Sequence, residues 1–204
     1  MERDCDAADT QAAAGALASV TTRADAAPAV LELDGLRWRN ADPLDAAALE
    51  DLAQVGSNRV LFNLPGSEAE FELRVEKPGF RVAMLCTRDS RVIGAAATTR
   101  RDMRNRHVQL ICSFIDPATA ALALAMYVRH LFWSMPFNRV HAQIPDVDGA
   151  QAYVDLMGGI GFVNEGTVRD HALIGGRPHS VIVLGLLRRE FEAWTEVNEK
   201  RLSL

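Results

Sequence analysis

The chain has 204 residues, of which 49% are hydrophobic and 24% are charged, and its formal net charge is −5. This length predicts one globular domain with at most an appendage, and the composition excludes collagen-like, coiled-coil and wholly disordered chains. Three scattered cysteines without a Cys-x-x-Cys pair exclude a disulfide scaffold and a structural zinc site, so we expect no metal. Because no apolar run is long enough to span a bilayer and no secretion signal is recognisable, we expect a cytoplasmic protein that does not bind membranes.

The first residues differ in composition from the rest of the chain. Residues 1–29 are rich in Ala, Asp and Thr and carry few large apolar side chains, so we expect a disordered tail. A single domain is expected over residues 30–197, followed by a C-terminal tail over 198–204. Val30–Leu33 and Leu36–Arg39 alternate apolar and polar residues, which predicts a half-buried strand at the start of the domain.

Two helices are expected next. Asp42 followed by Pro43 has the pattern of a helix N-terminus, because the carboxylate accepts from free N–H groups and proline suits the first turn. Ser67 with Glu70 has the capping-box pattern of a second helix, which Pro78 ends. The spacing places Leu44, Ala48, Leu49 and Leu52 on the apolar side of the first helix, and Phe71 and Val75 on that of the second.

Three strands are predicted in the middle of the chain, over Phe80–Cys86, Val92–Thr99 and His107–Ile115. The connections between them are short, which favours antiparallel hairpins. Along the third strand, side chains alternate between two faces. One face would carry Val108, Leu110, Cys112 and Phe114, and the other would carry His107, Gln109, Ile111 and Ser113.

The period of the apolar residues changes after this strand. Helical spacing extends over Pro117–Met135, and Pro136 ends the helix. Asn138–Ile144 predicts a strand. A helix with Tyr153 on its apolar face follows this strand, and Gly158 with the glycine after it marks its end.

Two strands complete the predicted domain. They extend over Phe162–Leu173 and Ser180–Leu187, and the turn Gly175–Pro178 joins them. The predicted order is therefore a strand, two helices, three strands, a helix, a strand, a helix and two strands.

This order, together with several local sequences, resembles the GNAT superfamily of N-acyltransferases over residues 36–187. The resemblance implies an α/β fold with a mixed central sheet flanked by helices, and it points to the branch that acetylates ribosomal proteins, protein N-termini and small amines. The stretches that carry it are Arg91-Val92-Ile93-Gly94, Gly161-Phe162, Glu165-Gly166, Arg169-Asp170-His171, Gly176-Arg177 and the last strand from Val181 to Leu187.

Members of this family bind acyl-CoA as a co-substrate where two neighbouring parallel strands splay apart. The resemblance places this donor site between the strands His107–Ile115 and Asn138–Ile144. It also implies that backbone amides near Ile111, Cys112 and Ser113 bind the donor and stabilise the tetrahedral oxyanion. Acetyl-CoA is the donor that the family uses by default.

The sequence departs from the family where the pyrophosphate of the donor would bind. Family members place a glycine-rich loop at the N-terminus of the next helix, where free N–H groups attract anions. Here the connection lacks both glycine and arginine, so the loop is degenerate or shortened, and Ala118, Thr119 and Ala120 are the candidate phosphate-binding residues. Asp116 would place a negative charge at this point, or it would cap the helix.

Tyr153 is a candidate proton donor. Members of the family often protonate the leaving thiolate with a tyrosine of this helix, but counting back from Gly161-Phe162 places Met157 nearer to that position. Because Tyr153 lies on the apolar face of the helix, a packing role and a catalytic role are both open.

His107 and His171 are the candidate bases. A histidine titrates near neutral pH, so it can accept the proton of an ammonium group directly or through water. His107 lies on the expected donor strand, and His171 fits a recurrent family position on the final hairpin. Glu165 and Asp170 are alternatives that would attract a cationic amine.

Four arginines lie in the connection Arg100–Arg106. Such a cluster is either a solvated turn or an anion-binding surface, for which Arg101 and Arg104 are the candidates. The anion would be the 3′-phosphate of CoA, a phosphate-bearing acceptor or the backbone of a tRNA.

The favoured function is the transfer of an acyl group, by default acetyl from acetyl-CoA, to a primary amine of a small molecule or peptide in a ternary complex. A second hypothesis keeps the fold and changes the donor to an aminoacyl-tRNA or a carrier-bound acyl group, because the pyrophosphate loop is degenerate. A third is a non-catalytic binding module. The acceptor stays open, and the sequence is compatible with a monomer or a homodimer.

Overall fold

A computed structural model of the protein describes residues 31–33, 35–56, 58 and 81–202. Within this part of the chain, eight strands form one sheet: β1 (Leu31–Leu33), β2 (Leu36–Asn40), β3 (Arg81–Cys86), β4 (Val92–Asp102), β5 (His107–Phe114), β6 (Arg139–Pro145), β7 (Val163–Ile174) and β8 (Arg177–Leu187). The helices of the same part are η1 (Pro43–Asp45), α1 (Ala46–Gln54), η2 (Pro117–Thr119), α4 (Ala121–Ser134), α5 (Ala150–Gly158) and α6 (Arg188–Leu202), where η marks a short 3₁₀ helix.

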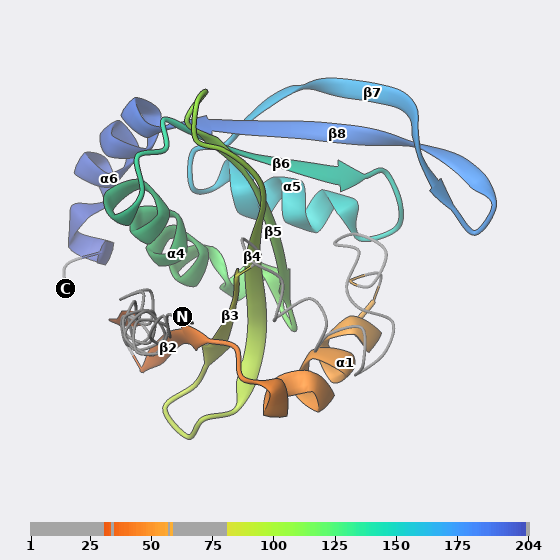
Figure 1. Ribbon diagram of the computed structural model, residues 1–204. Helices are drawn as coiled ribbons and strands as arrows, with labels where there is room; N and C mark the ends of the chain where they lie inside the picture. The colour runs from red at the N-terminus through yellow and green to blue at the C-terminus, as the bar shows by residue number, and fades with distance from the viewer. Residues whose placement is uncertain (1–30, 34, 57, 59–80, 203–204) are drawn as a thin grey trace, which may run out of the picture.

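The strand order in the sheet is β1-β2-β3-β4-β5-β6-β8-β7. Neighbouring strands are antiparallel except for β5 and β6, which run parallel. Figure 1 shows the twisted sheet through the middle of the molecule, with the β7–β8 hairpin extending past the helices. The predicted fold class, a mixed sheet flanked by helices, is therefore confirmed.

The first elements differ in detail from the sequence-based expectation. The single predicted strand is a hairpin, because β1 turns back on β2 with Leu31 opposite Trp38. The predicted cap is confirmed, since the Asp42 carboxylate accepts from the N–H of Leu44 at 2.9 Å. The placement of Leu44 on the apolar side was wrong: it is 90% exposed, because it lies in η1, where the three-residue turn rotates it away from the sheet. The second helix, predicted from Ser67, lies outside the described residues.

The two central hairpins confirm the prediction for the middle of the chain. β3 pairs with β4, and β4 with β5, both in antiparallel register. The predicted faces of β5 are also confirmed, because its apolar set belongs to the main core together with the buried residues of α4. The other set, His107, Gln109, Ile111 and Ser113, lies on the opposite face of the sheet.

Two cores hold the helices on opposite faces of the sheet. The larger core joins β5 and β6 to α4, α5 and α6, and it includes Leu124, Phe132, Tyr153 and Phe191. The smaller core joins α1 to β3 and β4 through Leu49, Leu52, Met84, Cys86 and Ala95. No helix in the described part of the chain is long and apolar enough to cross a membrane.

The last helix, α6, was not predicted, because Arg188–Leu202 is mostly polar and carries few apolar residues. Two aromatic rings attach it to the larger core: Phe191 is fully buried, stacks on Trp194 at 5.7 Å and packs on Phe132 at 5.6 Å between ring centroids. The helix continues past residue 197, where we expected the domain to end.

Asp45 joins η1 to the sheet. Its carboxylate accepts two hydrogen bonds from the Arg39 guanidinium, at 2.5 and 2.6 Å, and one from the N–H of Asp42 at 2.7 Å. Burial raises the pKa of Asp45, but the hydrogen bonds from Arg39 and Asp42 outweigh burial and hold this pKa below its ordinary value of 3.8. The pair is therefore ionised at neutral pH and fixes the start of α1 on the sheet.

We expect Asp45→Asn to lower the free energy of unfolding by about 1–2 kcal/mol at neutral pH, because the amide cannot accept both guanidinium bonds. The folded-state pKa of Asp45 is depressed, so its stabilisation is present above the unfolded value and is lost as the pH falls through the folded one. Urea unfolding should therefore show a smaller difference from the native chain in strong acid. Asp51→Asn, an exposed position on α1, is the matched control. Equal unfolding midpoints for both variants at neutral pH would contradict the role of Asp45.

Candidate functional site

The parallel strands β5 and β6 pair over only three residues each, from His107 opposite Arg139 to Gln109 opposite His141. Beyond this point β5 continues to Phe114 and β6 to Pro145 without pairing to each other. We call these unpaired ends the β5–β6 gap. In the antiparallel pair, β4 forms hydrogen bonds with the N–H and C=O groups of every second residue of β5. The N–H and C=O groups of the other β5 residues therefore face the gap.

One end of the gap is closed by Tyr153 of α5. The Tyr153 hydroxyl accepts from the N–H of Phe114 at 3.0 Å and donates to Oδ1 of Asn58 at 2.8 Å. The Asn58 side chain in turn donates to the carbonyl oxygens of Phe114 and Leu52, both at 3.1 Å. Tyr153 belongs to α5 in the larger core, whereas Asn58 follows α1 on the other face of the sheet. The hydrogen bonds between them therefore cross from one face of the sheet to the other, at the place where β6 no longer pairs with β5.

The environment of the Tyr153 hydroxyl keeps it protonated. Burial raises the pKa of Tyr153 well above its ordinary value of 10, and the hydrogen bond from the N–H of Phe114 only partly opposes this. Ser113 Oγ lies beside this hydroxyl, but without the geometry of a hydrogen bond. A phenol with a raised pKa and an existing acceptor is a poor proton donor to a thiolate, so the geometry favours the packing role of Tyr153 over the catalytic one.

The start of α4 carries its own carboxylate. The Asp116 side chain accepts from the N–H of Ala118 at 3.0 Å and from the Thr119 hydroxyl at 3.1 Å, which confirms the predicted cap. The predicted helix begins here as η2 and continues as α4. A cavity of about 180 Å³ lies beside this end and is lined by Thr119, Ala120 and Arg91 among others. A phosphate here would have to displace the Asp116 carboxylate from the N–H of Ala118.

The paired end of β5 and β6 holds two histidines on the same face of the sheet. The rings of His107 and His141 meet edge to face, with centroids 5.5 Å apart. His107 Nε2 lies 3.5 Å from a carboxylate oxygen of Asp102. Nδ1 of both histidines is buried and has no hydrogen-bond partner among the described residues. The two Nδ1 atoms are therefore polar groups whose hydrogen-bonding capacity the described residues leave unused.

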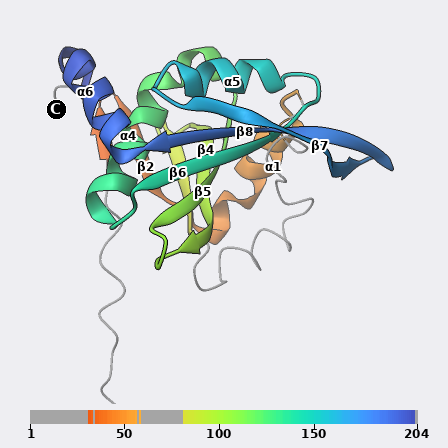
Figure 2. The ribbon, with the colours of Figure 1, turned by 90° about the horizontal axis from the view of Figure 1, so that it is seen from above.

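An ion pair borders the histidines. Arg139 of β6 donates two hydrogen bonds to Glu165 of β7, across β8, and Figure 2 shows these three strands side by side. Gly185 of β8 makes this contact possible, because a Cβ there would lie 2.3 Å from Oε1 of Glu165. Burial, followed by the charges of Arg139 and His107, lowers the pKa of His141 to about 4. His141 is consequently neutral at physiological pH.

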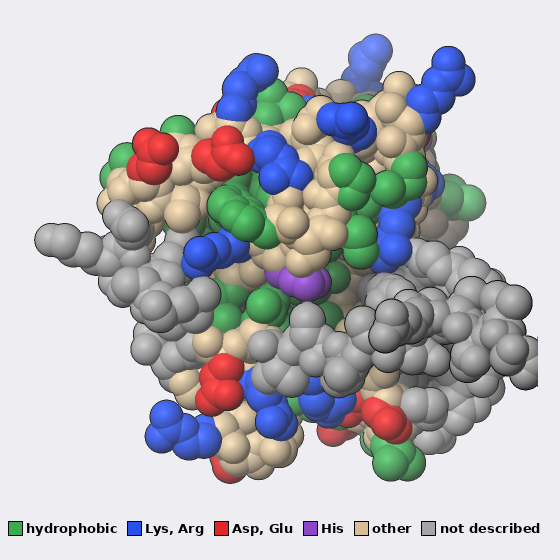
Figure 3. All heavy atoms as spheres, turned by 60° about the vertical axis from the view of Figure 1, so that its left-hand side comes forward, with side chains coloured by type: hydrophobic (Ala, Val, Ile, Leu, Met, Phe, Trp, Pro, Cys, Tyr) green, Lys and Arg blue, Asp and Glu red, His purple; other side chains and the backbone are tan. Residues whose placement is uncertain are grey.

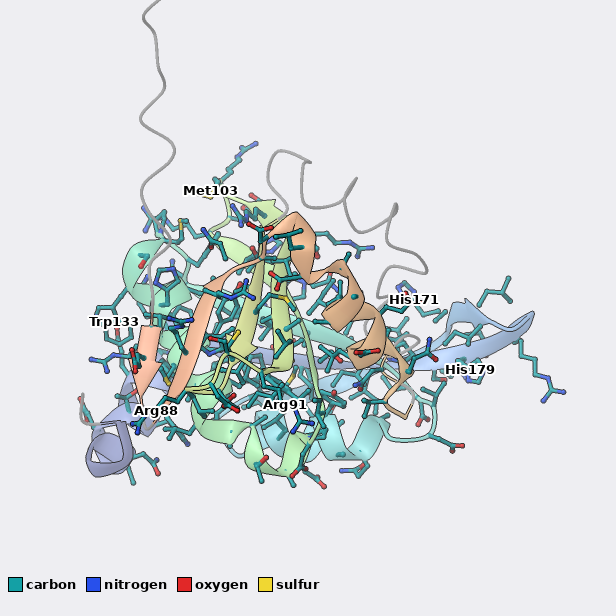
Figure 4. All side chains as sticks on the ribbon, turned by 90° about the horizontal axis from the view of Figure 1, so that it is seen from below. Arg88, Arg91, Met103, Trp133, His171 and His179 are labelled. Atoms are coloured by element: carbon teal, nitrogen blue, oxygen red, sulfur yellow. The ribbon has the colours of Figure 1, made fainter. Side chains whose placement is uncertain are left out.

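The predicted site residues do not all meet. Ile111, Cys112 and Ser113 lie at the gap, and Ala118, Thr119 and Ala120 lie beyond it at the start of α4. Figure 4 places Met103 of the arginine connection far from Arg91, which lines the cavity at the start of α4. Arg101 and Arg104 are therefore at the opposite end of β4 and β5 from Ala118–Ala120, so they cannot hold the 3′-phosphate of a CoA whose pyrophosphate lies at Ala118–Ala120.

His171 is separate from the other candidates. It is exposed on β7, and Figure 4 shows it with His179 on the hairpin that extends away from the body of the molecule. Tyr153 and His107 also lie apart, because Tyr153 reaches the end of β5 at Phe114 whereas His107 is its first residue. Glu165 is paired with Arg139 rather than free to attract an amine.

No protein-family model matches this sequence, and no curated protein matches it. Solved structures do. A GCN5-related N-acetyltransferase from Brucella melitensis matches with a TM-score of 0.69 and 18% identity, covering 85% of each chain. A mutant of the spermidine N-acetyltransferase from Vibrio cholerae matches with a TM-score of 0.66 and 16% identity, over 78% of this chain and 98% of that one. A ribosomal-protein-S5-alanine acetyltransferase from Vibrio fischeri matches with a TM-score of 0.64 and 12% identity, over 79% and 98%.

The chain has the GNAT fold. At identities this low the similarity establishes the architecture, and the residues of the site have to be argued individually. Three of them were missed by the analysis of the sequence: His141, Asn58 and Asp102. The alternation of β6 offers a signal for His141, since Arg139, His141 and Gln143 share one face of a strand whose other face is apolar. No local pattern marks Asn58, because its partner Tyr153 is 95 residues away.

We expect Tyr153→Phe to lower the free energy of unfolding by about 1–3 kcal/mol, because it leaves the buried N–H of Phe114 and the Asn58 amide without their partner. Tyr127→Phe is the matched control: this tyrosine is also buried, but no described residue hydrogen-bonds to its hydroxyl. Urea unfolding of both variants measures the difference. Equal losses in the two variants would contradict the structural role of the Tyr153 hydroxyl.

A second prediction concerns His141. Its pKa is lower in the folded than in the unfolded chain, so the unfolded chain binds more protons between about pH 4 and 6.5 and stability falls as the pH drops through this range. His141→Gln removes this effect. On going from pH 7 to 5, the variant should gain about 1 kcal/mol relative to the native chain, after allowance for solvent screening. His171→Gln, on the exposed hairpin, should show no such gain in urea unfolding; an equal gain there would contradict the assignment.

Proposed function

We propose that the protein is an N-acyltransferase that moves an acyl group from a thioester donor to a primary amine. The observation that carries this proposal is the β5–β6 gap itself, since parallel strands that separate after three residue pairs expose backbone groups in the sheet of a protein with the GNAT fold. The amine nitrogen attacks the thioester carbonyl, the C–S bond breaks, the thiolate takes a proton from solvent, and the ammonium proton passes to a base.

His107 is the base in this proposal. Asp102 lies at its Nε2, and the buried Nδ1 has no partner among the described residues. Because His107 lies five residues before Cys112 on β5, we propose that the amine proton reaches this nitrogen through a chain of waters. His141 is a weaker base because burial lowers its pKa to about 4. The backbone N–H of Cys112 is the proposed oxyanion donor, since alternation along β5 directs it into the gap.

Acetyl-CoA is the donor we propose first, and the amines to test first follow from the names of the similar structures: spermidine and a peptide with N-terminal alanine. A second donor class, an aminoacyl-tRNA or a carrier-bound acyl group, is favoured by one specific observation. The chain's own Asp116 and Tyr153 already occupy the N–H groups of Ala118 and Phe114, which a CoA donor would otherwise use.

The test is an acyl-transfer assay with His107→Gln. We expect acetyl-CoA to be consumed in the presence of one of these amines, and the variant to lose about 100-fold in kcat/KM because the general base is removed. His171→Gln is the control, since His171 is exposed on the hairpin away from the gap and should keep full activity.

Two outcomes would contradict parts of this proposal. Equal activity of His107→Gln and the native chain would reject His107 as the base. Calorimetry without heat at millimolar acetyl-CoA would reject CoA as the donor, and transfer from an aminoacyl-tRNA that is abolished by ribonuclease would then establish the second donor class. No turnover with any donor over a panel of amines would reject catalysis and leave the third hypothesis, a non-catalytic binding module.

A further inference from the structure

A second cavity lies away from the β5–β6 gap. Its volume is about 220 Å³, and its described lining comes from the first two strands, β3, β4 and α4 and its C-terminus, with no residue from β5 or β6. Figure 3 shows the side of the molecule that carries α4 and α6, where histidine atoms lie within a hollow of the surface. The lining residues on which its chemistry depends are Trp38, Arg39, Thr98, Arg101, Tyr127 and His130.

A bulge in β4 directs Arg101 toward this cavity. The β4–β5 register shifts between Thr99 and Asp102, and Arg100 adopts a positive φ of 46°. Arg101 consequently lies beside Thr98 and donates to its hydroxyl at 2.6 and 3.1 Å. A left-handed backbone at a non-glycine residue costs about 1 kcal/mol, so the fold maintains this direction against strain.

The two arginines of the lining are bound to acceptors of the protein itself. The Arg39 guanidinium donates to both carboxylate oxygens of Asp45, and Arg101 donates to Thr98. An anionic ligand would have to compete with these acceptors and would lose its hydration in a mostly apolar cavity. A cationic ligand would meet two guanidinium groups and no Asp or Glu in the described lining. The lining therefore favours an uncharged ligand.

Two side chains of α4 offer neutral hydrogen-bonding groups. Tyr127 packs its ring on Trp38, with centroids 5.0 Å apart, and no described residue hydrogen-bonds to its hydroxyl. This hydroxyl is not among the fully buried polar atoms that lack a partner, so it borders the cavity that Tyr127 lines. His130 binds Ser134 Oγ through Nδ1 at 2.9 Å, which leaves Nε2 for a ligand. Burial raises the pKa of Tyr127 and lowers that of His130, so both side chains are uncharged at neutral pH.

We propose that this cavity binds a small uncharged aromatic molecule that carries a hydroxyl group. Its ring would pack on Trp38, Leu131 and Met135. Its hydroxyl would bind Tyr127 and His130 Nε2, and it fits both because a hydroxyl donates and accepts, whichever ring nitrogen of His130 carries the proton. The size agrees, since a protein cavity of about 150 Å³ takes up benzene and this one is larger.

The experiment is calorimetric titration of the full-length chain with phenol. Toluene is the probe of equal size without the hydroxyl, and benzoate and benzylamine are the charged probes. Phenol should bind about 5-fold or more tightly than toluene, which corresponds to at least one hydrogen bond, and the charged probes should give no heat.

Two variants test the hydrogen-bonding groups. Tyr127→Phe should remove most of the preference for phenol without weakening the binding of toluene, and it retains the fold because it removes no described hydrogen bond. His130→Ala should weaken phenol binding. His171→Ala is the matched control, because His171 is exposed on the β7–β8 hairpin and does not line the cavity.

Four results would overturn the proposal. Absence of heat with phenol at millimolar concentration would reject the site. Benzoate or benzylamine that binds as tightly as phenol would reject the uncharged ligand class. An unchanged preference for phenol in Tyr127→Phe would reject the hydroxyl contact, and equal losses in His130→Ala and His171→Ala would show non-specific binding. None of these measurements involves a thioester or acyl transfer, so failure here and failure of the proposed function are distinguishable.

Discussion

Backbone N–H and C=O groups inside a folded protein require partners, and β5 loses the partner on one side when β6 separates from it after Gln109. Much of the surrounding structure follows from this requirement. Tyr153 accepts the N–H of Phe114, and Asn58 donates to its carbonyl oxygen, so α5, the segment after α1 and the end of β5 meet at one point. The fold thereby satisfies the backbone at the closed end of the gap with its own side chains.

The other end of the gap has a different chemistry. There the strands are still paired, and the side chains of Arg139, Glu165, His107 and His141 share one face of the sheet. The arginine neutralises the glutamate, and its positive charge adds to burial in keeping His141 uncharged. Polar groups that can carry a proton thus gather at one end of the gap, whereas a packed, hydrogen-bonded tyrosine occupies the other. This division separates proton transfer from the backbone groups proposed to stabilise an oxyanion.

Features that depend on near neighbours were predictable from the sequence. The hairpins of β3, β4 and β5, the alternating faces of β5 and the caps at Asp42 and Asp116 all follow from local spacing, and the structure confirms them. The α6 helix was not predictable in this way, since the side chains that attach it, among them Arg188, Phe191 and Trp194, have partners in other parts of the chain. Leu44 was misplaced because the sequence does not distinguish a 3₁₀ turn from the first turn of an α-helix.

By itself the sequence determined the order of the elements, the buried face of each and the residue types available for chemistry, because period and capping are properties of a few consecutive residues. Only the tertiary structure decided which of those residues meet. It joined Tyr153 to Asn58 across 95 positions, placed His141 against His107 and separated Arg101 from Ala118. A bulge in β4 directs the Arg101 side chain into a cavity. Such outcomes depend on strand register and on where two strands part, and these are set by packing over the whole sheet.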